Sequence, residues 1–336
     1  MADGDGFDSD GAGSKIDLQA YIYLALMVLI GSCTAPAAKF AVRELPAGFL
    51  PLIRFGVAGL CLLPIVGRRG GNLGELFRTD FWRLALAAAL CIPVNQTFFL
   101  NGARLAPTSH IALIYASCPL FVLLMSLALG QERLVASRLA GIIASMSGVV
   151  VIGLDSFLRG GAGGHETLQG DLLLLGAVSS WGAYLTVSKP LIARHGPLTV
   201  LAGTFLVGTA LHVPVALATM PGWAPLSNAS GTAWRGLFVL TMVVTLVGLT
   251  FQNLAMKRLD ASQVASFGNA APLLTVVWGV WLFGETLTPA LIVGGALTLG
   301  GILWTSRAPR TRDARNADEV PVIATDFERF ASVPPR

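Results

Sequence analysis

Charged residues are scarce in this chain, and their scarcity excludes an ordinary soluble domain. Asp, Glu, Lys and Arg make up only 12% of the 336 residues, whereas about one-quarter of a soluble domain is charged. Hydrophobic residues make up 54%. This composition indicates a protein whose surface lies largely in a lipid bilayer.

The residue types that usually carry catalysis or bind metals are also few or scattered. No Asp or Glu lies deep in an apolar run, and the four histidines have no metal-site spacing. The four cysteines match no zinc or redox pattern, and we interpret them as small packing residues. The net charge of +4 comes from basic residues at the ends of apolar runs, which argues against nucleic-acid binding. The sequence therefore predicts no enzyme, no metal and no cofactor.

Long apolar runs, by contrast, fill most of the chain. About ten of them approach the roughly 20 residues that an α-helix needs to cross a bilayer. They lie at residues 19–40, 47–66, 81–102, 107–129, 137–154, 171–192, 198–219, 233–256, 261–283 and 289–306. The sequence therefore predicts an all-α integral membrane protein with ten transmembrane helices. A disordered tail is expected at 1–18, an external linker at 157–170 and a second tail at 307–336.

The basic residues between these runs predict how the chain is oriented. If the N-terminus is cytoplasmic, the inside segments carry fifteen Lys and Arg residues and the outside segments about five. This positive-inside bias places both termini in the cytoplasm of a multi-pass protein of the plasma membrane. We interpret Lys39 and Lys189, which lie near opposite faces, as interfacial anchors.

The sequence repeats itself at a separation of 153 residues, as between Pro119 and Pro272. The same ungapped register pairs Phe98 with Phe251, Ser109 with Ser262, Glu132 with Glu285, and Gly148 with Gly301. A separation of 150 residues pairs Phe55 with Phe205. The chain is therefore predicted to contain two five-helix units, at 19–156 and 171–306. Because five is odd, the two units have opposite orientations, and such inverted repeats are typical of secondary transporters.

Several motifs resemble those of EamA domains in the drug/metabolite transporter superfamily. They are "GSCTAPAAK" (31–39), "PLIRFGVAGLCLLP" (51–64), "ARLAPTSHIALIYASCPLFVLLMSLALGQE" (103–132), "SSWGAYLTVSK" (179–189) and "KRLDASQVASFGNAAPLLTVVWGVWLFGE" (257–285). The resemblance covers residues 21–306. It implies a ten-helix carrier, commonly an exporter of amino acids or other small metabolites.

Uncharged polar residues within the apolar runs are candidates for a central cavity, where the resemblance places their helices. In lipid such groups are costly unless they are paired or face water. The candidates are Asn95, Gln96, Tyr115, Trp181, Tyr184, Gln252, Asn253 and Asn269. The alternative is that they form hydrogen bonds between helices. Arg54, the only charge deep in a run, either contacts a substrate carboxylate or is a structural arginine that bonds helix carbonyls.

Two prolines and two glutamates occupy equivalent positions in the repeats. Pro119 and Pro272 lie near the middle of their runs, where they predict bends that shape the cavity and assist gating, or else static kinks. Glu132 and Glu285 lie just before the next run. Each is predicted to cap that next helix or to form a salt bridge at the rim.

Together these features predict a secondary transporter that exports a small metabolite, an amino acid or a related compound, by alternating access. The alternative is a broad-specificity efflux carrier for hydrophobic or cationic compounds. His212 is either a hydrogen-bonded packing residue or part of a coupling mechanism. Small residues recur at 141–148 and at 294–301, and we interpret them as packing ridges that could also support a homodimer.

Overall fold

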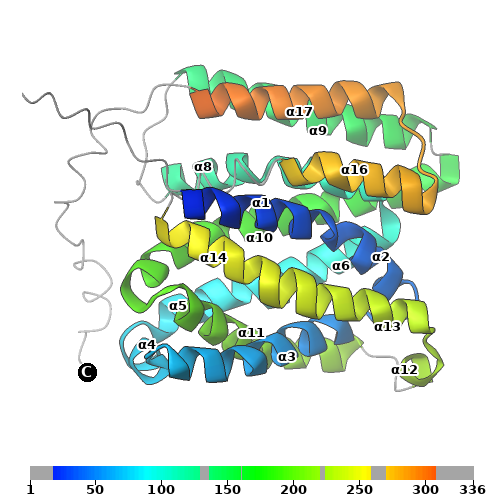
Figure 1. The fold of residues 1–336 in the computed structure, drawn as a ribbon. Coiled ribbons are helices and arrows are strands. Elements are labelled where there is room, and N and C mark those ends of the chain that lie inside the picture. The colour runs from blue at the N-terminus through cyan, green and yellow to red at the C-terminus, as the bar shows by residue number, and fades with distance from the viewer. Residues whose placement is uncertain (1–17, 129–135, 160, 220–223, 259–269, 308–336) are drawn as a thin grey trace, which may run out of the picture.

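The computed structural model describes residues 18–128, 136–159, 161–219, 224–258 and 270–307, and these ranges contain helices but no strand. In chain order the elements are α1 (Leu18–Ser32), α2 (Thr34–Val42), α3 (Phe49–Arg68), α4 (Leu73–Thr79), α5 (Phe81–Ala89), η1 (Leu90–Val94), α6 (Asn95–Leu105), α7 (Thr108–Ala116), α8 (Cys118–Ala128), α9 (Ala136–Arg159), α10 (Gly161–His195), α11 (Pro197–Thr219), α12 (Ala224–Asn228), α13 (Gly231–Phe238), η2 (Val239–Gly248), α14 (Leu249–Arg258), α16 (Ala270–Phe283) and α17 (Pro289–Arg307). The long helices run alongside one another in a single bundle (Figure 1).

Seven stretches of the described chain are long and apolar enough to cross a membrane. They are Ile22–Val42, Phe49–Arg68, Phe81–Leu105, Thr108–Ala128, His165–His195, Pro197–Thr219 and Gly231–Lys257, and shorter apolar helices lie at Leu274–Phe283 and Pro289–Gly301. Large apolar side chains face outward, among them Trp281, which is 73% exposed. These side chains suit contact with lipid tails. The prediction of a helical, multi-pass membrane protein is therefore confirmed.

The first apolar stretch is broken at Cys33, between α1 and α2, and Pro36 explains the break. Proline has no N–H, so it cannot donate to the carbonyl of Ser32, four residues earlier. Thr275 of α16 supplies the missing donor, because its hydroxyl lies 3.1 Å from the Ser32 carbonyl oxygen. A local defect in one helix thus becomes a specific contact with another.

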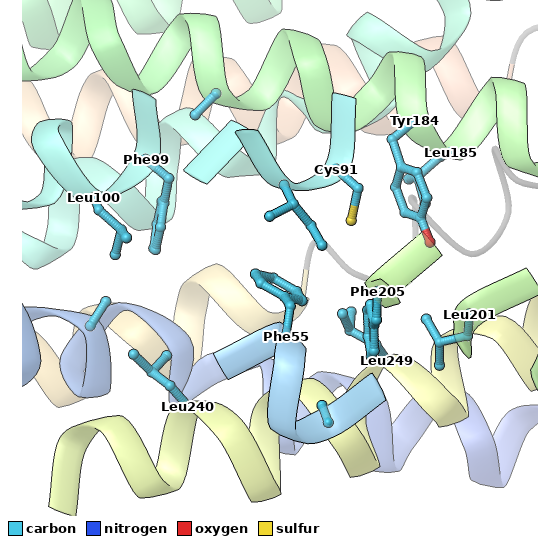
Figure 2. Packing of buried hydrophobic residues seen from close by; sticks show 14 of the residues in the cluster. Phe55, Cys91, Phe99, Leu100, Tyr184, Leu185, Leu201, Phe205, Leu240 and Leu249 are labelled. Atoms are coloured by element: carbon cyan, nitrogen blue, oxygen red, sulfur yellow. The ribbon is translucent and has the colours of Figure 1, made fainter. Parts of the chain in front are cut away.

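The centre of the bundle contains residues that correspond in the two halves of the sequence. Phe55 of α3 and Phe205 of α11 are fully buried, and their rings pack edge to face with centroids 5.2 Å apart (Figure 2). Nearby, a Cβ on Gly59 would lie 3.2 Å from the Cβ of Phe205. The absence of a side chain at Gly59 therefore lets α3 and α11 approach closely.

The predicted packing ridges meet each other at one edge of the bundle, where α9 and α17 lie side by side (Figure 1). A Cβ on Gly148 would lie 2.3 Å from the carbonyl oxygen of Gly294. No side chain fits in that space. The faces that could have supported a homodimer are therefore used, at this point, for a contact within the chain.

The structure differs from the expected layout between the two halves. Residues 157–170 were expected to form a linker, but α9 runs to Arg159 and α10 begins at Gly161. Helix α10 is 35 residues long, because no proline or left-handed glycine interrupts its first half. The expected tails at 1–17 and 308–336 lie outside the described residues.

Candidate functional site

A cavity of about 210 Å³ lies where helices from both halves of the chain converge. Its walls come from α1, α2, α3, α6, α7, α8, α10, η2, α14 and α16. The lining residues are Met27, Val28, Gly31, Thr34, Ala35, Arg54, Asn95, Gln96, Phe99, Ile111, Ala112, Tyr115, Cys118, Trp181, Leu185, Val244, Gly248, Leu249, Gln252, Ala271 and Thr275. Most are apolar or aromatic, a few are amides or hydroxyls, and one is charged.

The charged residue is Arg54, in the second turn of α3, which is only 5% exposed. Its Nε donates a hydrogen bond to the hydroxyl of Thr245, and its Nη1 donates to Oε1 of Gln96 at 3.1 Å. The guanidinium carbon lies 4.9 Å from the centre of the Phe55 ring, so a cation–π contact adds to these bonds. Arg54 is therefore held by three neutral groups.

Both hydrogen-bond partners of Arg54 depend on segments of π-helix. Pro93 lies inside η1, where the wider turn accommodates its ring and its missing N–H, and Gln96 follows two residues after this segment. Thr245 lies inside η2. Segments of π-helix occur frequently at functional sites, and they rotate the side chains that follow them. Here they bring two polar side chains to one arginine.

A continuous chain of hydrogen bonds extends from Arg54 into the second half of the protein. Gln96 donates from Nε2 to Oδ1 of Asn95 at 2.7 Å. Asn95 in turn donates from Nδ2 to the carbonyl of Ala177 at 2.7 Å, with the hydroxyls of Tyr115 at 3.3 Å and Ser180 at 3.4 Å. The chain thus joins α3, α6, α7 and α10 around the cavity.

Aromatic rings form another part of the cavity wall. Tyr115 packs edge to face against Phe99 with ring centroids 5.6 Å apart, and both line the cavity. Trp181 lines it from α10, and its ring centroid lies 5.1 Å from that of Tyr184. A ligand in this space would therefore meet ring faces as well as amides.

The structure brings together most of the residues that the sequence proposed for a cavity. Arg54, Asn95, Gln96, Tyr115, Trp181 and Gln252 all line it. Tyr184 and Asn253 are buried but are not among its lining residues (Tyr184 in Figure 2). Asn269 lies outside the described residues. The roles of these residues in binding stay predictions.

Sequence reasoning missed the hydroxyl partners of this site. Thr245 binds Arg54, and Thr275 satisfies the carbonyl freed by Pro36 while also lining the cavity. Both are threonines in apolar runs, and this signal is weak because a helical threonine usually bonds its own helix. Only the contacts between helices identify these two.

The two predicted proline bends have different outcomes. Helix α7 ends at Ala116 and α8 begins at Cys118, so the helix breaks at Ser117, two residues before Pro119. The break lies there because proline removes the donor for the carbonyl four residues earlier and crowds the preceding residue. Pro272 lies near the start of α16, and the residues before that helix are outside the described part.

Glu285 caps a helix, but not the one that its position in the sequence indicated. It accepts hydrogen bonds from the backbone N–H of Thr108 at 2.7 Å and of Ser109 at 2.9 Å, at the N-terminus of α7, instead of capping α17. It also forms a salt bridge with Lys39 at 3.2 Å. Lys39 is therefore paired, which differs from the expected anchor at the membrane interface. Glu132 lies outside the described residues.

Two glycines allow Glu285 to reach α7. Gly284 adopts the left-handed conformation, with φ 64°, which ends α16 and turns the chain back. A Cβ on Gly279 would lie 2.7 Å from Oε2 of Glu285. The spacing of these residues in "WGVWLFGE" thus has a steric reason.

The electrostatics of Glu285 favour its charged form. Burial by itself raises the pKa of this carboxyl. The backbone N–H groups of Ser109 and Thr108 and the charge of Lys39 outweigh burial, and the pKa lies below its usual value. The charged carboxylate therefore joins α2 and α7 to the end of α16.

Further polar contacts join α10 to neighbouring helices, one in its first half and others near its C-terminal end. Asp171 lies 3.0 Å from Nδ1 of His110, at the start of α7. At the other end, Nε2 of His195 lies 2.9 Å from Asp80, just before α5, and Arg194 is 3.3 Å away. Lys189 donates to the carbonyl of Met256 at 3.0 Å.

His212 is also used in packing. Its Nε2 lies 3.0 Å from the carbonyl oxygen of Gly48, at the start of α3, and the residue is 1% exposed. This contact agrees with the packing interpretation. Within the described residues, no three His, Cys, Asp or Glu side chains are grouped so that they could hold a metal ion.

Comparisons with known proteins agree with this architecture. A sequence profile of the EamA-like transporter family matches residues 18–154 and again residues 168–307. A probable terminal-alkyne amino-acid exporter of Streptantibioticus cattleyicolor is 29% identical over 303 residues, which cover 89% of this chain and 96% of the relative. The aromatic amino acid exporter YddG of Ancylobacter novellus is 29% identical over 206 residues, covering 61% and 69%.

More distant similarities agree with this result. An uncharacterized transporter of Archaeoglobus fulgidus is 23% identical over 288 residues, covering 86% of this chain and 97% of the relative. A solved crystal structure shares the fold with a TM-score of 0.61 at 23% identity, over 90% of this chain and 99% of its own. Because the family profile matches most of the sequence, in two successive copies, the chain belongs to the EamA-like transporter family.

Proposed function

We propose that this transporter exports a small metabolite, an amino acid or a related compound, through the cavity between its two halves. The observation that carries the proposal is the lining of that cavity, which combines amides, a tyrosine hydroxyl and aromatic rings with one arginine. Such a lining suits a molecule with a polar end and an apolar end. Two relatives named as amino-acid exporters support the same substrate class.

The size of the cavity supports a small substrate. Its volume of about 210 Å³ is below the roughly 300 Å³ at which pockets for drug-sized ligands begin. The efflux of cationic compounds is disfavoured, because the one charge among the described lining residues is positive.

We further propose that the chain has ten transmembrane helices in two inverted units, 19–156 and 171–306, with both termini in the cytoplasm of a plasma-membrane protein. The two family matches, at 18–154 and 168–307, support the division into units. So does the contact between Phe55 and Phe205, which correspond in the repeat. Residues near a pseudo-twofold axis are expected to meet their counterparts in this way. The distribution of basic residues supports the orientation.

Transport assays test the substrate class. Metabolite profiling of medium from cells that overexpress or lack the protein should show a changed amino acid or related compound, and proteoliposomes should then take up that compound. Trp181→Ala, in the cavity wall, should reduce uptake. Trp281→Ala, at a lipid-facing position that is 73% exposed, is the matched control and should leave uptake unchanged. If no amino acid or related metabolite responds in either assay, the proposed substrate class is wrong.

A further inference from the structure

Arg54 carries a charge that the protein does not neutralise within the described residues. Its hydrogen-bond partners, Thr245 and Gln96, are neutral, and no carboxylate of ranges 18–128, 136–159, 161–219, 224–258 or 270–307 forms an ion pair with it. The sequence places no Asp or Glu deep in any apolar run, including the run that continues through 261–269. Buried charges in proteins are normally paired, because an isolated charge in an apolar medium is strongly destabilised.

From this unneutralised charge in the cavity wall we infer that Arg54 binds the carboxylate of the transported substrate, and that the substrate is a monocarboxylate with an apolar or aromatic side chain. The inference rests on the proposed export function and specifies the substrate class of the same cavity. A guanidinium suits this role, because its planar array of N–H donors matches the geometry of a carboxylate. Nε and Nη1 are held by Thr245 and Gln96, while Nη2 has no protein partner among the described residues.

The two protein bonds orient the arginine without cancelling its charge. Thr245 and Gln96 fix the plane of the guanidinium from η2 and α6, so that it is ordered before a ligand arrives. Such preorganisation reduces the entropy that binding would otherwise cost. A purely structural arginine would also make these two bonds, but it would have no reason to line the cavity with its charge uncompensated.

The rest of the cavity limits what the other end of the substrate can be. Apart from Arg54, no described lining residue is basic, so a second carboxylate would find no counter-charge among them. None of the described lining residues is acidic, so among them an ammonium group would meet amide oxygens, hydroxyls and aromatic faces. Apolar walls come from Met27, Ile111 and Leu185, with the rings of Phe99 and Trp181 beside them. The carboxylate is therefore required for binding, and the amino group is secondary.

Binding to the purified wild-type protein tests this requirement directly. The probes are L-phenylalanine and L-leucine, compared with L-phenylalaninamide and phenethylamine, which lack the carboxylate. Ligand-induced thermal stabilisation in detergent and competition for uptake in proteoliposomes are the two readouts. We expect the two acids to bind about 10- to 100-fold more tightly than the two amines, which is typical for loss of a charge-assisted hydrogen bond.

Variants of Arg54 complete the test. Arg54→Gln should weaken the binding of L-phenylalanine by about 10- to 100-fold and abolish the preference for the acid over the amide. Arg54→Lys keeps the charge and should recover part of this preference. Arg235→Gln is the matched control, because Arg235 is exposed and its hydrogen bonds stay within its own helix. Size-exclusion profiles establish that each variant is folded.

The possible outcomes separate this inference from the proposed function. If the wild type binds L-phenylalaninamide as tightly as L-phenylalanine, or if folded Arg54→Gln keeps the wild-type preference, the inference is overturned while the proposed export function stands. If the wild type transports no amino acid, the proposed function fails. If the wild type still binds L-phenylalanine in that case, its affinity relative to L-phenylalaninamide decides the role of Arg54 without any variant. If it binds none of the four probes, the inference is overturned as well.

Discussion

The contact between Glu285 and the N-terminus of α7 provides the sharpest test of how the helices are held together. Oε1 of Glu285 accepts bonds from the Thr108 N–H and from Lys39 Nζ, and Oε2 accepts from the Ser109 N–H. The side chains of Lys39 and Glu285 are only 17% and 12% exposed. We expect Glu285→Ala to release α2 and α7 from the end of α16, and Glu285→Gln to have a smaller effect because it keeps one acceptor oxygen.

The expected magnitude follows from two contributions. Loss of a side-chain cap typically costs about 0.5 to 2 kcal/mol. Loss of one partner of a buried ion pair costs about 3 to 5 kcal/mol when both groups are fully enclosed, and this pair retains some access to solvent. We therefore expect Glu285→Ala to lower the free energy of unfolding by about 2 to 4 kcal/mol. The Lys39–Glu285 coupling should be about 1 kcal/mol.

The assay is unfolding by SDS in mixed micelles, followed by tryptophan fluorescence, for Glu285→Ala, Lys39→Met and the double variant. The matched control is Glu75→Gln, which removes an exposed acid in α4 and should change stability by less than about 0.5 kcal/mol. If Glu285→Ala is no less stable than this control, the contact does not hold the three helices together. If the single-variant effects simply add, Lys39 and Glu285 are not coupled.

The same carboxylate predicts a dependence on pH. Its pKa in the folded protein lies below its usual value, since the N–H groups and Lys39 outweigh the effect of burial. A depressed pKa means that Glu285 contributes stability above the unfolded-state pKa of about 4.3, and that this contribution is lost as pH falls through the lower folded-state value. The wild type should therefore lose more stability on acidification than Glu285→Gln does. If the stability of the two proteins depends on pH in the same way, Glu285 does not have the lowered pKa described above.

Three further predictions concern other contacts. Gly148→Val should lower the free energy of unfolding by about 3 kcal/mol in the SDS assay, because a Cβ there would lie 2.3 Å from a backbone oxygen of α17; an unchanged value would contradict the close approach of α9. Gly279→Ala should displace the carboxylate of Glu285, so the effects of this variant and of Glu285→Ala on the free energy of unfolding should not add in the double variant. If the two effects add fully, the steric account is wrong. Burial raises the pKa of Asp80, but the hydrogen bonds from His195 and Arg194 and the charge of Arg194 outweigh burial, and the pKa lies below its usual value. Asp80 therefore stabilises the fold above the unfolded-state pKa of about 3.9, and this contribution is lost as the pH falls. Asp80→Asn should remove this loss of unfolding free energy at low pH. If the variant and the wild type depend on pH in the same way, Asp80 does not contribute to the pH dependence.

Much of the candidate site could be predicted, because polar groups in lipid are conspicuous. An amide or a charge in an apolar run is costly unless it is paired or faces a cavity, so the sequence identified Arg54, Asn95 and Gln96 among others. The structure brings these three into one hydrogen-bonded chain beside the cavity. The sequence did not distinguish them from Asn253, which is equally polar but not among the lining residues.

Local irregularities were the hardest feature to predict. Pro93 lies inside η1, but η2 is an apolar run with two threonines in which no proline marks the wide turn. These segments decide which side chain faces Arg54, because one extra residue in a turn rotates everything that follows. Likewise, the position of Glu285 next to α17 indicated a cap for that helix. The left-handed Gly284 directs the carboxylate to α7 instead.

By itself the sequence determined that this protein is a helical membrane transporter with an internal repeat, and it named the polar residues in the apolar runs. It could do so because a bilayer imposes length and polarity rules that act on each segment separately. Only the tertiary structure decided which groups meet. Lys39 pairs with Glu285 across 246 residues, and Arg54 bonds Thr245 across 191. Such contacts depend on the rotation and closeness of neighbouring helices, which kinks, wide turns and missing side chains set together.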